Sequence, residues 1–507
     1  MATHREIETK LEAPAAAVLP DLTGLPGVAS VDEPEEIELE AVYLDTPDLR
    51  LTRAGLSLRR RTGGPDAGWH VKLPAAGDER TELQAPLGDD DGAPPPALAA
   101  AIRARVRGAA LEPVAVLRTR RTVHRLRDAE GQVLAEVADD RVTSRAPGER
   151  DVVVDAWREW EVELVDGDRP LLRAALARLE AADGTTAAWS SKLRRALRDR
   201  LAADGPDDAA RPASGSAGAV LQGRLRAHRD RLLELDPAVR RDEPDAVHQM
   251  RVTTRRLRSA LTTFRPLLDR ERSELVRAEV RWLTGVLGAA RDAEVERGRL
   301  SGLVHEQPAE LVLGPVAARL DQDRAQAYRA AHDEALAAMD SDRYLRLLDA
   351  LDALVDDPPF STMAELPAAT LLPRLVRHEF RRLGKRLDAA QAAEPGRVRD
   401  AALHESRKAA KRARYAAELV APVVGRAAER SAEAAEAVQD LLGEHHDTVG
   451  VRDHLRRIGI EAHLAGENAF TYGRLHALEE ARAQRLEQRV AEVADPLRSK
   501  KRRRWMR

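Results

Sequence analysis

The chain has 507 residues, with 82 Lys plus Arg against 85 Asp plus Glu and a formal net charge of −3. Hydrophobic residues make up 43%, and no apolar run approaches the roughly twenty residues of a membrane span, which excludes a disordered chain and a membrane protein. The absence of cysteine excludes disulfides and thiol chemistry, and the start lacks a signal-peptide pattern, so a cytoplasmic protein is expected.

The charge is divided unevenly along the chain. Residues 1–200 carry 29 basic and 36 acidic side chains, whereas residues 201–507 carry 53 and 49. Only eight of the 82 basic residues are lysines. Because a compact ammonium differs from a guanidinium fork, a lysine in a patterned position is a candidate functional residue.

Residues 1–202 have the pattern of an antiparallel β domain. Apolar and charged residues alternate at 6–10, 56–59, 69–73 and 160–164, and turn signals separate these runs. Helices are expected near 95–107, 169–182 and 190–202. The alternation predicts strands with one charged face.

Carboxylates and cations gather on this charged face. Glu6, Glu8 and Lys10 share a face of the first strand, and Glu161 and Glu163 share a face of a late strand. Four carboxylates on neighbouring strands suit Mg²⁺ or Mn²⁺. The cations that alternate nearby are Arg59, Arg61, Arg118, Arg120, Lys72 and Lys192. Such a mixture suits metal-bound polyphosphate, and a solvated sheet face is the alternative.

The second half is expected to be all helical. Residues 203–218 are rich in Gly, Pro, Ser and Ala and are predicted to be a linker, followed by a helical domain at 219–507. Within it, three landmarks recur in the same order about 150 to 156 residues apart. The paired landmarks are His228 with His378, His248 with His404, and Leu287-Gly288 with Leu442-Gly443. They predict a duplicated helical unit.

Two basic stripes accompany the repeat. Spacings of three and four residues place each stripe on one face of a helix. The stripes are His248, Arg251, Arg255 and Arg258, and then His404, Arg407, Lys411 and Arg414. Opposed stripes of one charge favour a polyanion between or along them, and a solvated face is the alternative.

The order of motifs in residues 1–200 resembles the CYTH family, the triphosphate tunnel metalloenzymes. The motifs are Glu6-x-Glu8-x-Lys10, Tyr43-Leu44-Asp45-Thr46-Pro47, Leu58-Arg59-x-Arg61, Lys72-Leu73-Pro74, Arg80-x-Glu82, Arg118-x-Arg120, Glu136 with Asp140, Glu161-x-Glu163 and Ser191-Lys192. The resemblance implies an eight-stranded antiparallel β-barrel tunnel that binds triphosphate. The choices between Arg120 and Arg121 and between Asp139 and Asp140 stay open, and alternation from Glu136 favours Asp140.

This resemblance implies roles for individual residues. Metal ligands would be Glu6, Glu8, Glu82, Asp140, Glu161 and Glu163. Phosphate would be bound by Lys10, Arg59, Arg61, Lys72, Arg80, Arg118, Arg120 and Lys192. Glu136 and Lys72 would act in catalysis, with Glu136 positioning water, and the cofactor would be Mg²⁺ or Mn²⁺.

Residues 217–500 resemble the CHAD family, through the duplicated His-x-x-Arg stripes and the Leu-Gly-x-x-x-Asp segments. The resemblance implies two four-helix units and association with inorganic polyphosphate. The residues expected to bind polyphosphate are His228, His248, Arg251, Arg255, Arg258, His378, His404, Arg407, Lys411 and Arg414.

The leading hypothesis is a metal-dependent inorganic triphosphatase with a polyphosphate-binding helical domain, cytoplasmic and associated with polyphosphate granules. One alternative is a non-catalytic protein that localises to polyphosphate, and another is an adenylate cyclase acting on ATP. Nucleic-acid binding is disfavoured because only 3% of the residues are aromatic. The basic run at 498–504 keeps that option open, since it could bind a polyanion or be solvated.

Overall fold

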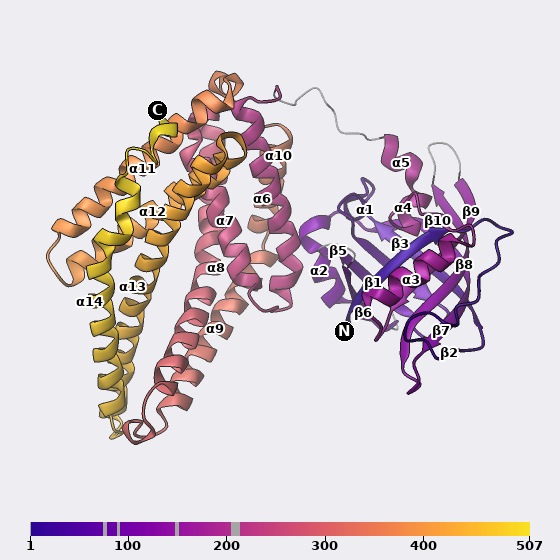
Figure 1. Ribbon diagram of the computed structural model, residues 1–507, viewed down its shortest axis with the longest axis horizontal. Helices are drawn as coiled ribbons and strands as arrows, with labels where there is room; N and C mark the ends of the chain where they lie inside the picture. The colour runs from indigo at the N-terminus through magenta and orange to yellow at the C-terminus, as the bar shows by residue number, and fades with distance from the viewer. Residues whose placement is uncertain (1, 75–78, 89–91, 148–151, 204–212) are drawn as a thin grey trace. The chain divides into compact units, whose positions relative to one another are not determined.

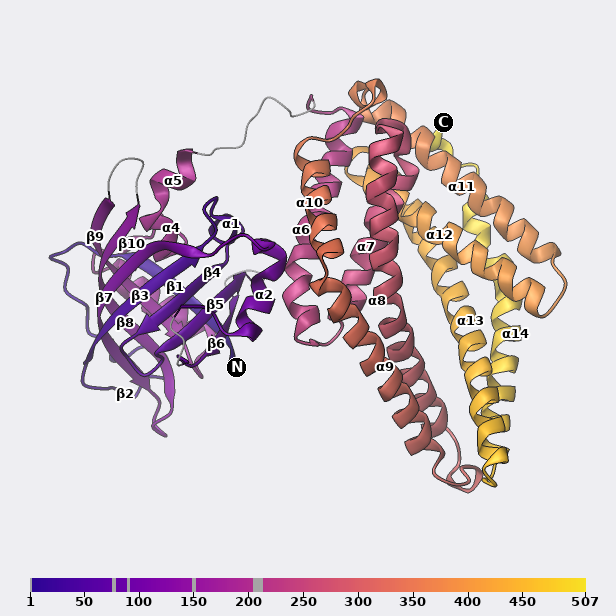
Figure 2. The same cartoon turned by 180° about the vertical axis from the view of Figure 1, so that it is seen from behind.

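The computed structural model describes the chain except for residues 1, 75–78, 89–91, 148–151 and 204–212. The side chains of residues 2–6, 79, 80 and 203 also lie outside the described set. Residue contacts divide the chain into two compact units, 1–207 and 208–507 (Figures 1 and 2). Most of the expected linker, 203–218, falls outside the described residues. None of the helices in the described part is long and apolar enough to cross a membrane.

The first unit is built on an antiparallel sheet. Its strands are β1 (Ala2–Glu12), β2 (Ser30–Val31), β3 (Glu35–Asp45), β4 (Ser57–Thr62), β5 (Gly68–Pro74), β6 (Glu79–Ala85), β7 (Glu112–Arg127), β8 (Val133–Pro147), β9 (Val152–Leu164) and β10 (Thr185–Thr186). They follow the order β10-β1-β6-β5-β4-β3-β7-β8-β9, and β2 pairs with β7. The antiparallel β domain expected from the alternation is confirmed.

Strand β1 links the two ends of this sheet. It pairs with β6 over residues 2–7 and with β9 over residues 7–12, so each neighbour covers half of its length. The sheet therefore curves around a central tunnel, but its wall lacks continuous pairing at β1. The word barrel describes it only loosely.

Apolar residues of the sheet anchor the helices of this unit. These helices are α1 (Arg50–Arg53), α2 (Pro96–Val106), α3 (Arg169–Glu180), α4 (Lys192–Ala196) and α5 (Arg198–Ala203). Trp160 and Leu171 belong to a core that joins β1, β8 and β9 to α3, and Trp69 and Leu98 belong to one that joins β4–β6 to α2. Because alternate residues point to opposite faces, the residues between these core positions point into the tunnel.

The second unit is all helical, as expected. Its helices are α6 (Ala217–Arg240), α7 (Ala246–Thr263), α8 (Arg270–His305), α9 (Val316–Asp340), α10 (Asp342–Asp356), α11 (Ala368–Ala392), α12 (Arg397–Val424), α13 (Arg426–Leu464) and α14 (Phe470–Arg498). The repeated landmarks lie on corresponding helices, so α6–α9 correspond to α11–α14 and α10 lies between the two sets.

The two sets of helices pack together at several places. Helix α7 packs against α12, which brings the helices that carry the basic stripes side by side. Farther along, an apolar cluster joins α8, α9, α13 and α14 through residues such as Leu300, Leu320, Leu455 and Leu475. The stripes are therefore held on a rigid scaffold.

Candidate functional site

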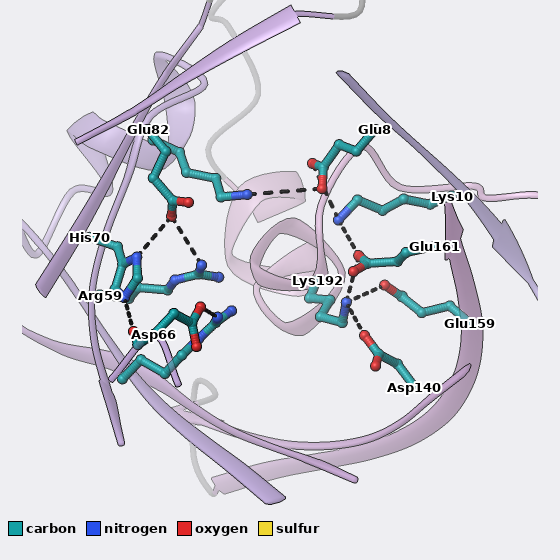
Figure 3. A network of polar contacts seen from close by, with 12 residues as sticks. Glu8, Lys10, Arg59, Asp66, His70, Glu82, Asp140, Glu159, Glu161 and Lys192 are labelled. Carbon is teal, nitrogen blue, oxygen red and sulfur yellow. Dashed lines mark hydrogen bonds and ion pairs between the residues drawn. The ribbon is translucent and has the colours of Figure 1, made fainter. Parts of the chain in front are cut away.

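The tunnel contains a network of carboxylates and cations from several strands (Figure 3). Its centre is Glu161 of β9, whose carboxylate accepts hydrogen bonds from Lys10 at 2.5 Å and from Lys192 at 2.7 Å. Lys192 also lies 2.8 Å from Asp140 and 2.7 Å from Glu159. Lys192 is the first residue of α4, a helix capped by the Ser191 side chain, which accepts from the Arg194 backbone N–H.

The charges in this network control one another's pKa values. Burial acts to raise the pKa of Glu161, but Lys10, Lys192 and Arg121 outweigh it and hold that pKa well below its usual range. For Lys192 the directions are reversed. Burial acts to lower its pKa, and its three carboxylate neighbours outweigh burial and raise the pKa. Glu161 and Lys192 are therefore ionised at neutral pH and held by mutual attraction.

Strand β7 contributes Arg121 to the tunnel, and the expectation that Arg118 and Arg120 face inward is wrong. The Arg118 and Arg120 side chains are 73% and 63% exposed and pair with Glu40 and Glu38 on the outer surface. Arg121 lies on the opposite face and forms ion pairs with Asp140 and Glu161. The reason is the register, which places Arg121 directly opposite Asp140.

Strand β8 places Asp140 inside and Asp139 outside. The Asp140 side chain is fully buried, and burial is offset by Lys192 and Arg121, which lower its pKa. Asp139 instead pairs with Arg158 at 2.6 Å on the other face. The alternation counted from Glu136 therefore identifies the inward residue.

A row of like charges crosses β1, β9 and β8 at one level of the tunnel. Glu163 is in register with Glu8 on one side and with Glu136 on the other. Burial raises the pKa of Glu163, and Glu8 and Glu161 add to the effect while Lys72 opposes it. Glu136 is partly exposed and pairs with Arg125 at 2.9 Å.

Two predicted site residues are described only by their backbones. The register places Glu6 opposite Arg80 across β1 and β6, two residues from Glu8 and Glu82. Their side chains lie outside the described residues.

The opposite wall of the tunnel holds a second network, on β4, β5 and β6. Glu82 accepts from Arg59 at 3.1 Å and lies 3.0 Å from Nδ1 of His70. Nε2 of His70 lies 2.9 Å from the Asp66 carbonyl oxygen, and Arg61 pairs with the Asp66 carboxylate. Glu82 thus has Arg59 and His70 as partners and lies apart from the carboxylates around Glu161 (Figure 3).

A turn between β4 and β5 presents Asp66 to this network. Gly63 and Gly64 have φ of +79° and +74°. A Cβ on Gly63 would lie 2.1 Å from the Glu38 carbonyl oxygen, so only glycine fits. The turn therefore fixes the residue that holds Arg61.

Several tunnel residues received no role in the sequence-based assignment, although Arg121 was the open alternative to Arg120. They are Arg121, Glu159, His70, Tyr43 and Asp66. Alternation from Glu161 and Lys72 points to Glu159 and His70. Arg121 and Asp66 depend on strand register and turn geometry, which a single sequence does not reveal.

The donor set of the tunnel fits a hard divalent cation. Asp140, Glu159 and Glu161 are buried, and each offers one carboxylate oxygen within 4.8 Å of the others. Oxygen-only ligands are those that Mg²⁺ and Mn²⁺ prefer. Glu8 and Glu163 add a second pair of adjacent carboxylates. Metal binding at this wall therefore agrees with the residues present.

In the helical unit, the two stripes form one central cation cluster, which we define as Arg251, Arg255, Arg407 and Lys411. Burial, then Arg255, Arg407 and Arg251, lower the pKa of Lys411 to about 6. Burial, with Arg251 and Arg407, lowers the pKa of Arg255 to about 10. These cations repel one another, so a bound polyanion would stabilise them.

The Leu-Gly-x-x-x-Asp segments seat the arginines of this cluster. A Cβ added at Gly288 would lie 3.7 Å from the Arg251 guanidinium, and one at Gly443 would lie 3.3 Å from that of Arg407. Asp292, four residues after Gly288, pairs with Arg251 at 3.2 Å. A Cβ at Gly443 would therefore crowd Arg407, whereas one at Gly288 would be in ordinary contact with Arg251.

The remaining stripe residues have different surroundings. Arg258 lies among Arg281, Arg412 and Arg277, which with burial lower its pKa. Arg414 is instead paired with Glu418 at 2.6 Å and Glu436 at 2.9 Å. The last residues of the two stripes therefore differ, because Arg258 lies among other arginines whereas Arg414 is paired with two carboxylates.

The histidines of the stripes also differ. The rings of His404 and His446 lie 4.2 Å apart, whereas burial and Arg291 lower the pKa of His248. Burial, with Arg256 and Arg224, lowers the pKa of His228 to about 4. His378 is exposed on α11.

Together, a tunnel lined by carboxylates and cations and a duplicated helical domain with a central cation cluster define a two-domain class of protein. The sequence profile of the CYTH domain matches residues 4–196, and that of the CHAD domain matches residues 223–456. The chain belongs to the proteins that join a CYTH domain to a CHAD domain.

Known proteins resemble all or part of this chain. Uncharacterized protein Rv2226 of Mycobacterium tuberculosis is 40% identical over 504 residues, covering 96% of this chain and 95% of its own length. The structure of PptA from Streptomyces chartreusis has 25% identity and a TM-score of 0.46, and covers 55% of this chain and 99% of that one. The CHAD domain of Ricinus communis has 24% identity and a TM-score of 0.46, and covers 58% and 96%.

Proposed function

We propose that the CYTH domain hydrolyses inorganic triphosphate in its tunnel with Mg²⁺ or Mn²⁺, and that the CHAD domain binds inorganic polyphosphate at its central cation cluster. The observation that carries the proposal is the set of buried, oppositely charged groups on facing walls of one tunnel. A metal-bound triphosphate carries the complementary charges, because its negative oxygens match the basic side chains and its metal ion matches the carboxylates.

The basic side chains would bind the phosphate oxygens. Those that point into the tunnel are Lys10, Arg59, Arg61, Lys72, Arg121 and Lys192, and we also assign Arg80 to this group from its register. Bidentate arginines would fix the orientation of the chain, and the lysines would neutralise individual oxygens.

The carboxylate wall would hold the metal. Glu8, Asp140, Glu159, Glu161 and Glu163 are the ligands we assign, with Glu6 from its register. A divalent cation supplies charge stabilisation at the phosphoryl oxygens and a more acidic water. Glu82 has its own cation partners, so we assign it to positioning Arg59.

Glu136 lies in line with this wall and is partly exposed. Its carboxylate would orient the attacking water, while Arg125 holds it in place. Lys72, in register with Glu82 and 3.9 Å from Glu8, would stabilise charge on the transferred phosphoryl group.

The test is phosphate release from tripolyphosphate, long-chain polyphosphate and ATP with Mg²⁺ or Mn²⁺. We expect the protein to release phosphate from tripolyphosphate. Arg121→Gln should slow this release by raising KM, whereas Arg120→Gln, on the outer face, should leave both the rate and KM unchanged. Production of cyclic AMP from ATP would assign the tunnel to cyclase chemistry. Polyphosphate binding without any phosphate release would assign the protein to a binding role.

A further inference from the structure

The C-terminal basic segment, which neither family profile covers, is docked onto the helical unit. The C-terminus lies beside α11 in both views (Figures 1 and 2). Met506 is 1% exposed, and the Trp505 indole N–H donates to the Ser431 hydroxyl at 3.0 Å. Two apolar or amphipathic side chains therefore hold a run of cations against the helices.

Docking of this segment brings basic side chains together around one cavity. The cavity has a volume of about 170 Å³ and is lined by α11 on one side and the C-terminal segment on the other. Its basic lining residues are Arg377, Arg381, Lys500, Arg503 and Arg507. We call this set the C-terminal clamp.

The clamp has a surplus of positive charge. In the part of the chain that the structure describes, an ion pair joins Arg498 to Asp388 of α11, but none joins a clamp residue to a carboxylate. Five cations around one cavity repel each other, and the docking of Met506 holds them there. An anion that bridges α11 and the segment would remove this repulsion.

Charge and lining decide the class of anion. One phosphate group carries about two negative charges, fewer than the five cations supply. Several linked phosphoryl groups match the clamp better. The aromatic side chains of the region are engaged in packing, since Phe380 is 6% exposed and Trp505 contacts Ser431. Among the described residues, the Phe380 ring that lines the cavity is almost fully buried and Trp505 lies outside the lining, so little ring surface is presented for base stacking, which disfavours single-stranded nucleic acid.

We propose that the C-terminal clamp is a second binding site for an inorganic phosphate chain, separate from the central cation cluster. The two sites are built from different helices, α11 and the C-terminal segment for one, and α7 and α12 for the other. A long chain bound at both sites would be held more tightly than at either alone, through the high effective concentration of its second segment.

The test uses the full chain and fluorescently labelled polyphosphate, with affinity measured by anisotropy at several salt concentrations. We expect Arg377→Gln/Arg503→Gln to weaken binding about tenfold at low salt and to reduce the salt slope by about 1.4, at about 0.7 per phosphate contact. The matched control is Arg485→Gln/Arg489→Gln, which removes two exposed arginines of α14 outside the clamp. Far-UV circular dichroism confirms that the helices of both variants are intact.

A third variant separates this inference from the proposed function. Arg255→Gln/Lys411→Gln removes charge from the central cation cluster only. If this variant loses affinity for polyphosphate while the clamp variant keeps the wild-type affinity, the clamp is overturned and the proposed function stays in place. Equal losses in the clamp variant and the α14 control would overturn it as well. A clamp variant that loses affinity for single-stranded RNA more than for polyphosphate would assign the clamp to nucleic acid instead.

Discussion

Glu161 and Glu163 lie two residues apart on β9 and point into the same tunnel, but their electrostatic surroundings are opposite. Glu161 contacts three cations, and its pKa is held well below the usual range despite burial. The pKa of Glu163 is raised, first by burial and then by Glu8 and Glu161, with Lys72 opposing. Replacing each with glutamine removes the charge and keeps the shape.

These surroundings predict stability changes of opposite sign. Glu161→Gln removes a carboxylate that three buried cations share, and breaking a buried ion pair costs about 3–5 kcal/mol. Glu163→Gln removes a charge that burial and the neighbouring carboxylates disfavour, so we expect this variant to gain stability.

The pH dependence follows from the directions of the two shifts. A lowered folded-state pKa stabilises the domain above the unfolded value, near 4.3 for glutamate, and this contribution is lost as pH falls. A raised folded-state pKa costs stability as pH rises through it. The gain from Glu163→Gln should therefore be present at neutral pH and vanish below about pH 4.

Urea unfolding without metal, followed by tryptophan fluorescence, measures these effects. Trp69 and Trp160 are fully buried in the tunnel domain and report on its unfolding. If both variants shift the free energy of unfolding in the same direction at neutral pH, the assignment of attraction to Glu161 and repulsion to Glu163 is refuted.

Three further predictions concern binding. Because Glu161 and its neighbours already pair with lysines, Mn²⁺ and a non-hydrolysable triphosphate analogue should each tighten the other's binding about tenfold in calorimetry, and independent affinities would contradict this. The pKa of Lys411, lowered to about 6, should rise when polyphosphate binds. Binding above that pH should therefore take up a proton and weaken as pH rises, as calorimetry in two buffers would show, and Lys411→Met should abolish the uptake. Gly443→Ala should weaken polyphosphate binding more than Gly288→Ala, because the added Cβ lies 3.3 Å from Arg407 but 3.7 Å from Arg251. Equal effects would argue against seating of the arginines by these glycines.

Local alternation was sufficient for much of the tunnel. Counting in twos from Glu136 identifies Asp140 as the inward residue, and the same count connects Glu161 with Glu163. Counting works on these strands because one inward residue is known for each, and every second residue of a strand points to the same face.

The same rule failed on β7, where no inward residue was known. Arg118 and Arg120 have the right spacing but occupy the outer face, while Arg121 enters the tunnel opposite Asp140. Cross-strand register depends on residues far apart in the sequence. His70 escaped notice for a different reason, since its role appears only beside Glu82 and the Asp66 carbonyl.

In the helical unit, the repeat predicted which residues come together but not their partners. The stripes do converge between α7 and α12. The carboxylates that pair with Arg414 come from a later turn of α12 and from α13. Arg414 and Arg258 therefore occupy equivalent positions in the repeat but have different neighbours. Duplication preserves positions, whereas ion pairs depend on each neighbour.

The most direct test of the account is the initial rate of metal-dependent phosphate release from tripolyphosphate by Asp140→Asn and Asp139→Asn. Both aspartates pair with an arginine, but only Asp140 lies inside the tunnel. The account predicts that Asp140→Asn lowers the rate at least about tenfold, the loss expected when a metal-site carboxylate is removed, while Asp139→Asn retains it. Full activity in a folded Asp140→Asn variant, or equal losses in both, would contradict catalysis inside the tunnel.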